Sequence, residues 1–168
     1  MTRIAVRRAV VADAAGIAHV HVRGWHEAYT GRMPQRVLDR LDIDRLTRAR
    51  QEMLRQEESG DDRRGSTWVA TSGGAIVGWA ASGPSRDDPP VADLELFAIY
   101  VLAAHYGTGA GQALLDAAVS TGPASLWVLD DNPRARAFYA RNGFAPDGAS
   151  KDDVRWGDAI SEVRLVRR

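Results

Sequence analysis

Residues 93–115, DLELFAIYVLAAHYGTGAGQALL, decide the fold of this chain. Leu94–Val101 is a run of apolar and aromatic residues with a single carboxylate, Glu95, and this length and composition are typical of a buried strand. A short linker leads to glycines at 107, 109 and 111, and residues 112–119 have the apolar spacing of a helix. A strand, a glycine loop and a helix N-terminus together present bare backbone N–H groups to an anion. The stretch therefore predicts a pyrophosphate site.

The glycine spacing narrows the choice of nucleotide. A P-loop requires Lys followed by Ser or Thr after its last glycine, and Gln112 and Ala113 occupy those places. A Rossmann fingerprint has the spacing G-x-G-x-x-G early in its domain, with an acid about twenty residues later. This chain has G-x-G-x-G late in its length, although Asp130 and Asp131 lie near the required distance. A Rossmann-like site for NAD or ATP is disfavoured but stays open at this point.

A second motif follows the next apolar run. Residues 130–144 read DDNPRARAFYARNGF, in which Asn132 begins a predicted helix, Phe138-Tyr139 lies about two turns into it, and Gly143-Phe144 ends the stretch. With this motif and the glycine loop, the chain resembles the GNAT superfamily of N-acetyltransferases, which use acetyl-CoA. The loop of that family has Gln or Arg, two residues, Gly, one residue, then Gly or Ala. Here Tyr106 stands in the first place, and every other place is filled.

The resemblance implies the fold: one α/β domain over residues 1–168, with a mixed, mostly antiparallel twisted sheet of about seven strands flanked by about four helices. The residue pattern predicts the elements in sequence order. They are strand 4–8, a helix capped by Asp13 and ending near Gly31, a second helix from Pro34 to about Met53, strands 67–71 and 75–81, a loop 82–90, strand 94–101, helix 112–119, strand 126–129, helix 132–142, and strands 144–149 and 161–166.

The resemblance also implies the cosubstrate contacts. The pyrophosphate would be bound by the loop residues Tyr106, Gly107, Thr108, Gly109, Ala110 and Gly111. The backbone of Ile99, Tyr100 and Val101 would pair with the pantetheine arm, and one of these N–H groups would serve the oxyanion. Asn132 would cap its helix and also hydrogen-bond the pantetheine or acetyl region. Because Tyr106 keeps the main-chain donor but lacks a charge, weaker binding of CoA is expected.

Glu95 is the candidate catalytic base and a candidate substrate-binding residue. An alkylamine has a pKa of roughly 10, so it must lose a proton before it attacks. Unless a bulge intervenes, strand alternation places Glu95 on one face with Phe97, Ile99 and Val101. A carboxylate among such neighbours is partly desolvated, which suits a base. Its place eleven residues before Tyr106 resembles that of the Glu base in several GNAT enzymes. The alternatives are a surface Glu, or one that binds the ammonium of the acceptor.

Tyr139 is the candidate acid and a cosubstrate contact. The resemblance implies that its hydroxyl lies near the CoA sulfur. A phenol with a pKa of about 10 is a weaker acid than a thiol at about 8.5. Its value is therefore a hydrogen bond to the leaving thiolate. The alternative is a Tyr whose ring fills the core while its hydroxyl reaches water.

The acceptor side is predicted on the first helix. His21, Trp25 and Tyr29 recur every four residues and so form one stripe. The resemblance places Trp25 and Tyr29 at the acceptor, although such a stripe is also typical of core. Asp152, Asp153 and Trp156, before the last strand, are further candidates. We expect a small-molecule primary amine as acceptor; a non-catalytic acyl-CoA-binding or regulatory domain is the alternative.

The composition excludes several other classes. The 22 basic residues balance the 22 acidic ones, which gives no general attraction to nucleic acid or to an acidic membrane. There is no cysteine, and the four histidines lack metal-binding spacing, so no metal is expected. No signal-peptide core and no apolar run of about eighteen residues is present. We expect a cytoplasmic protein, and the resemblance leaves a homodimer open.

Overall fold

The computed structural model describes residues 3–60, 65–154 and 160–168. Within these residues, five α-helices pack on a seven-stranded mixed sheet, which confirms the predicted α/β class. The strands are β1 (Ile4–Arg8), β2 (Ser66–Ser72), β3 (Ala75–Pro84), β4 (Leu94–Val101), β5 (Ala124–Leu129), β6 (Ala145–Asp153) and β7 (Ile160–Arg167). The helices are α1 (Ala14–Tyr29), α2 (Gln35–Leu38), α3 (Ile43–Glu58), α4 (Ala110–Val119) and α5 (Pro133–Arg141).

The strands lie in the order β1-β2-β3-β4-β5-β7-β6. Every neighbouring pair is antiparallel except β4 and β5, which are parallel and joined by the helix α4. β2 and β3 form the predicted hairpin, in which Gly73 and Gly74 both have positive φ, as a tight two-residue turn requires. A sheet that is antiparallel apart from one pair is not a doubly wound Rossmann sheet.

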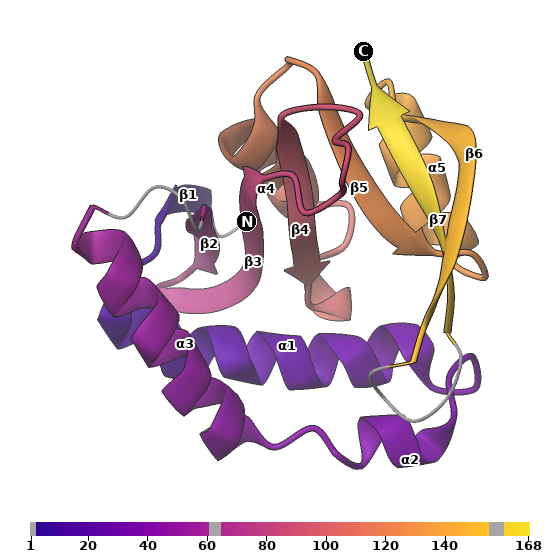
Figure 1. Ribbon diagram of the computed structural model, residues 1–168. Helices are drawn as coiled ribbons and strands as arrows, with labels where there is room; N and C mark the ends of the chain where they lie inside the picture. The colour runs from indigo at the N-terminus through magenta and orange to yellow at the C-terminus, as the bar shows by residue number, and fades with distance from the viewer. Residues whose placement is uncertain (1–2, 61–64, 155–159) are drawn as a thin grey trace.

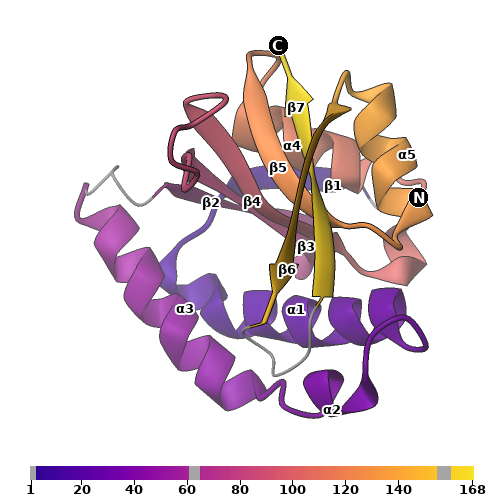
Figure 2. The same cartoon turned by 45° about the vertical axis from the view of Figure 1, so that its right-hand side comes forward.

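The helices cover both faces of the sheet. α1 and α3 pack on one face over a core that includes Ile17, Leu54 and Trp79, and Figure 1 shows them together below the strands. α4 and α5 cover the other face over Leu114 and Leu126 (Figure 2). β4 lies at the centre of the strand order, so both cores meet it and its side chains reach both layers.

The second predicted helix is two helices. The chain leaves the helical conformation after Leu38, and α3 begins at Ile43. Asp42 accounts for the new start, because its carboxylate accepts a hydrogen bond from Arg45 N at 2.7 Å and caps α3. The apolar spacing continues across this break, which is why the sequence predicted one helix.

β3 and β6 extend well beyond their predicted C-terminal ends. β3 includes Ser82–Pro84, which pair with Leu96, Glu95 and Leu94 of β4, although this stretch was assigned to a loop. Pro84 is the last residue of the strand and has no N–H group to donate. β6 extends through Asp152 and Asp153, both of which pair with β7. Trp156 lies outside the described residues.

None of the helices in the described ranges combines the length and the apolarity that a bilayer crossing requires.

Candidate functional site

A cleft opens where β4 and β5 separate. The two strands pair only at Glu95–Ser125 and Leu96–Leu126, and beyond these residues β5 pairs with β7 alone. The remainder of β4, from Phe97 to Val101, therefore has hydrogen-bonding groups on one edge that no strand uses. A cavity of about 1050 Å³ lies along this edge, and residues of α1, α3, α5 and the glycine loop complete its walls.

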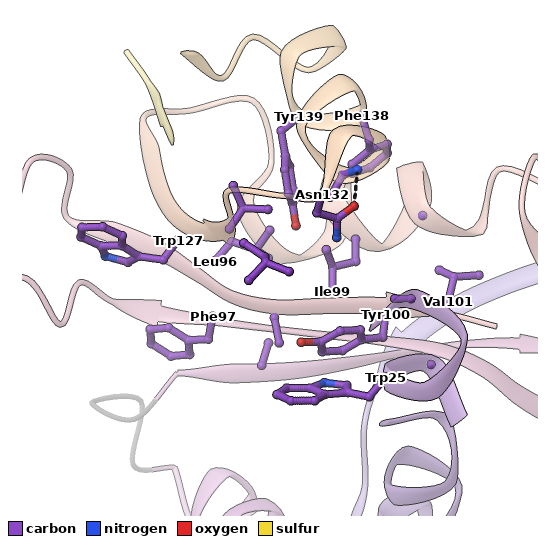
Figure 3. Close-up of a pocket in the computed structure, with 18 of the residues that line it drawn as sticks. Trp25, Leu96, Phe97, Ile99, Tyr100, Val101, Trp127, Asn132, Phe138 and Tyr139 are labelled. Carbon is purple, nitrogen blue, oxygen red and sulfur yellow. Dashed lines mark hydrogen bonds between the residues drawn. The ribbon is translucent and has the colours of Figure 1, made fainter. Parts of the chain in front are cut away.

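A β-bulge in β4 decides which side chains reach each side of the cleft. Ser82 pairs with Leu96 and Ala81 pairs with Ala98, so Phe97 is an extra residue between them. Leu96, Ile99 and Val101 consequently pack toward α4 and α5, and Phe97, Ala98 and Tyr100 pack toward α1 (Figure 3). The prediction that Glu95 shares a face with Ile99 and Val101 is therefore wrong, because the bulge at Phe97 shifts the alternation by one residue.

The glycine loop supplies the predicted donors. Gly107 and Gly109 have φ values of +75° and +88°, and a Cβ added at either position would meet no atom within 4 Å. Gly109 is the N-cap of α4. Within the described residues, the N–H groups of 109–112 have no protein partner. Gly107, Gly109 and Gly111 line the cavity, whereas Ala110 is fully buried in the core and the Thr108 hydroxyl bonds His105 O at 2.7 Å.

Tyr106 has a cationic neighbour that the sequence did not reveal. The guanidinium of Arg134, in the first turn of α5, lies over the Tyr106 ring at 3.5 Å from its centroid. Both residues line the cavity beside the glycine loop. Arg134 of α5 therefore places a positive charge directly beside Tyr106.

The phenols of Tyr29, Tyr100 and Tyr139 and the amide of Asn132 all line the cavity. Tyr139 points from α5 toward β4, and Asn132 lies beside it (Figure 3). The side-chain oxygen of Asn132 accepts from Ala135 N at 3.1 Å, which confirms the predicted cap, and the cap does not use its NH₂ group. Burial, and then the proximity of Tyr29, raises the pKa of Tyr139 well above its usual range. Burial also raises the pKa of Tyr29 and of Tyr100, so all three hydroxyls stay protonated at neutral pH.

Glu95 is buried and bound to Arg86. Its side chain is 1% exposed. Oε1 accepts from Arg86 Nε at 3.1 Å and Nη2 at 2.5 Å, and Oε2 accepts from the Arg86 backbone N at 2.8 Å. The guanidinium also stacks on Phe97, at 4.3 Å from its ring centroid. A carboxylate has about four lone-pair sites, so one site remains on Oε2, toward the cavity that Glu95 lines.

The aromatic stripe of α1 lies in the cavity. Its ring centroids are 5.3 Å apart between His21 and Trp25 and 5.3 Å apart between Trp25 and Tyr29. Tyr29 also hydrogen-bonds the side chains of Tyr100 and Asn132, which joins the stripe to the phenol group. The side chain of Tyr100, which the sequence offered only for its backbone, is thus part of the site.

His21 gives the protein a predicted acid sensitivity. Burial, and then the positive charge of Arg50, lowers its pKa from 6.5 to about 4. Between these values the unfolded chain binds a proton that the folded chain does not, so stability should fall as the pH falls from 6.5 to 4. The loss should reach about 1.4 kcal/mol per pH unit. His21→Phe, which keeps the stacking, should flatten this slope in urea denaturation; His19→Gln, on the exposed side of α1, is the control. An unchanged slope in His21→Phe would contradict this assignment.

The remaining acceptor candidates come from the segment before the last strand. Asp152 and Asp153 of β6 line the cavity, while Trp156 is not among the described residues. Across the described ranges, no three His, Asp or Glu residues gather closely enough to hold a metal ion.

Comparison with known proteins agrees with this geometry. A family model described as "Acetyltransferase (GNAT) family" matches residues 24–144. The chain is 28% identical over 152 residues to "Probable N-acetyltransferase Rv2775" of Mycobacterium tuberculosis, covering 88% of this chain and 83% of that protein. It is 29% identical over 168 residues to "Uncharacterized N-acetyltransferase YuaI" of Bacillus subtilis, covering 96% of this chain and 88% of that protein.

The fold has a close counterpart among solved structures. The PaiA N-acetyltransferase of Thermoplasma acidophilum, crystallised in complex with coenzyme A, superposes with a TM-score of 0.75 at 17% identity, over 99% of both chains. At this identity the likeness concerns the fold.

Proposed function

The chain belongs to the acetyltransferase (GNAT) family and is an acyltransferase; we propose that it transfers the acetyl group of acetyl-CoA directly to a primary amine of a small molecule. The observation that carries the proposal is the composition of one cavity. Unpartnered N–H groups at the α4 N-terminus, the free edge of β4 and the protonated phenol of Tyr139 all face it. These are the groups that binding of a pyrophosphate, an amide-bearing arm and a leaving thiolate requires.

The residues present fit acetyl-CoA, which supplies an acetyl group activated as a thioester. The N–H groups of residues 109–112 and the guanidinium of Arg134 would hold the pyrophosphate. The free edge of β4 at Ile99, Tyr100 and Val101 would pair with the pantetheine arm, and one of its N–H groups would donate to the developing oxyanion. The NH₂ group of Asn132 would donate to the same region.

Tyr139 would act as a hydrogen-bond donor to the departing sulfur. Its raised pKa keeps the proton on the phenol. A complete transfer to a thiolate, whose conjugate acid has a pKa of about 8.5, would be uphill. Tyr139 therefore stabilises the thiolate charge as it develops rather than delivering a free proton.

Glu95 would take the amine proton through the remaining lone-pair site on Oε2, directly or through a water molecule. Arg86 would hold the carboxylate in place, since it binds both oxygens and stacks on Phe97. This arrangement orients the base but leaves it only one site for the proton.

Glu95→Gln provides the test of this role. If Glu95 is the base, the variant should lose at least about tenfold in kcat/KM at neutral pH. The loss should shrink as the pH approaches about 10, where the amine is already neutral. Arg86→Gln is the matched control, because it also breaks the ion pair but keeps the carboxylate, and it should retain more activity at neutral pH. A Glu95→Gln pH profile parallel to that of the wild type would exclude the base role.

The acceptor end of the cavity supports a small molecule. Trp25, Phe97 and Tyr100 line it from α1 and the lower face of β4, and their rings form an aromatic surface of a size suited to a small amine (Figure 3). A cytoplasmic location and a homodimer stay predictions.

The overall proposal is tested by incubating the protein with acetyl-CoA and a panel of primary amines. Release of free CoA thiol, together with the mass of the product, reports transfer. Acetylation of at least one small amine is the expected result. Binding of acetyl-CoA without turnover of any amine would favour the non-catalytic acyl-CoA-binding alternative.

A further inference from the structure

Arg50 lies on the inward face of α3, at the acceptor end of the cavity. It is four residues before Leu54, which is 1% exposed and packs in the core under α1. Its guanidinium stacks on Trp79 of β3, at 4.1 Å from the ring centroid, and its charge acts on both His21 and Tyr100. The side chain is therefore half-buried and lines the aromatic pocket.

Among the residues that the structure describes, this guanidinium has no anionic partner. Within the described residues, Arg50 forms no ion pair, and its single hydrogen bond is a weak contact from Nη1 to Met53 Sδ at 4.0 Å. Among the described residues, the acid whose charge acts on Arg50 is Glu57. Its two oxygens already accept hydrogen bonds from the backbone N and the hydroxyl of Thr67, at 2.8 and 2.6 Å. Burial lowers the pKa of Arg50, because removal of the guanidinium from water destabilises its charged form. Buried charges in proteins are ordinarily paired.

The cation at the other end of the acceptor pocket differs in this respect. Arg86 is paired with Glu95 and is 56% exposed. His21 adds no charge at neutral pH, because its pKa is about 4. Within the described part of the chain, Arg50 is thus a cation of the acceptor pocket that forms no ion pair. A planar guanidinium matches the two oxygens of a carboxylate.

We propose that Arg50 binds a carboxylate of the acceptor, so that the substrate is an amine that also carries a carboxylate and an apolar body. This inference rests on the proposed acetyl transfer and specifies its acceptor. Tyr100 contacts both ends of the arrangement: its ring centroid is 5.5 Å from that of Trp79, beneath Arg50, and its hydroxyl bonds Tyr29 in the phenol group. An amino acid with an apolar side chain has the required groups: a carboxylate for Arg50, an apolar body for the aromatic pocket and an amine to be acetylated.

Binding of a non-reactive probe tests Arg50 directly. The CoA-loaded protein is titrated calorimetrically with 3-phenylpropionate and with its neutral amide. The wild type should bind the carboxylate about tenfold or more tightly than the amide, since a hydrogen bond to a charged group contributes about 1.5–3 kcal/mol. Arg50→Gln should abolish this preference and Arg50→Lys should keep part of it. Arg48→Gln, on the exposed side of the same helix, should leave it unchanged. Equal binding of both probes, no binding of either, or a preference that survives in Arg50→Gln would overturn the inference.

Turnover separates this inference from the proposed function. Phenylalanine and 2-phenylethylamine differ only in the carboxylate and are assayed as acceptors with wild type and Arg50→Gln. A loss of kcat/KM confined to phenylalanine supports the inference. Acetylation of 2-phenylethylamine in preference to phenylalanine would leave acetyl transfer intact and overturn the role of Arg50. An Arg50-dependent carboxylate preference without acetylation of any amine would support the anion site and count against the proposed function.

Discussion

The Gly109→Asp variant is expected to lose about 10³-fold in affinity for acetyl-CoA while it folds like the wild type. Gly109 is the N-cap of α4, with φ at +88° and open space where a Cβ would stand. Asp tolerates this left-handed conformation better than most residues and is itself a good helix cap. Its carboxylate would face the pyrophosphate, and two unit charges about 4 Å apart repel by about 4 kcal/mol at an effective dielectric of about 20.

Gly109→Asn is the matched control, because Asn has the same shape and the same backbone tolerance without the charge. Calorimetric titration of both variants with acetyl-CoA should therefore show a much larger loss for Asp than for Asn. Near-equal losses of affinity would mean that the size of the side chain, and not its charge, prevents binding of acetyl-CoA. Unchanged binding in both variants would place the pyrophosphate elsewhere.

The Tyr139→Phe variant is expected to lose about 10²–10³-fold in kcat, the range measured when one donor to a developing charge is removed. The Tyr139 ring is 7% exposed and packs against Phe138 and Phe144, with centroids 5.4 and 5.9 Å away. Phe preserves these contacts, so the fold and the pocket should persist. Only the hydroxyl that faces the cleft is lost.

The dissociation constant of acetyl-CoA separates a chemical defect from a binding defect in this variant. It should change by less than about threefold, since less than about 0.7 kcal/mol of ground-state binding is expected to depend on the hydroxyl. Tyr29→Phe provides a comparison within the same phenol group, and its defect should lie mainly in the KM for the amine. A kcat of Tyr139→Phe close to that of the wild type would mean that Tyr139 only packs in the core and has no role in the reaction.

The sequence predicted the centre of the fold well because its signals there are local. The apolar run Leu94–Val101 is β4 without adjustment, and the glycines that followed it do begin a helix. Both depend on residues adjacent in the chain. The break between α2 and α3 escaped prediction because Asp42 interrupts an apolar spacing that continues on both sides of it.

The bulge at Phe97 escaped prediction for a different reason. One extra residue in a strand moves every later side chain to the opposite face of the sheet. The composition of β4 does not reveal whether such a residue is present. The bulge is defined by the pairing of β4 with β3, and this pairing includes Ser82, in a stretch that was assigned to a loop.

Arg50, Arg86 and Arg134 of the site were missed, and no spacing would have found them. Arg86 contacts Glu95 from the loop between β3 and β4. Arg134 of α5 contacts Tyr106 of the glycine loop. Arg50 of α3 contacts Trp79 of the sheet. Each pairing exists only after the layers have packed. Motifs identified the loop and the catalytic candidates, whereas tertiary structure alone shows which charges accompany them.

A crystal structure of the protein with bound CoA tests the central claim most directly. The proposal predicts pyrophosphate oxygens within hydrogen-bond distance of the N–H groups of residues 109–112, and a pantetheine arm along Ile99–Val101. It also predicts that the thiol sulfur lies against the Tyr139 hydroxyl. CoA bound with its pyrophosphate away from the α4 N-terminus, or with its sulfur remote from Tyr139, would contradict the assignment of this cavity as the site of acetyl transfer.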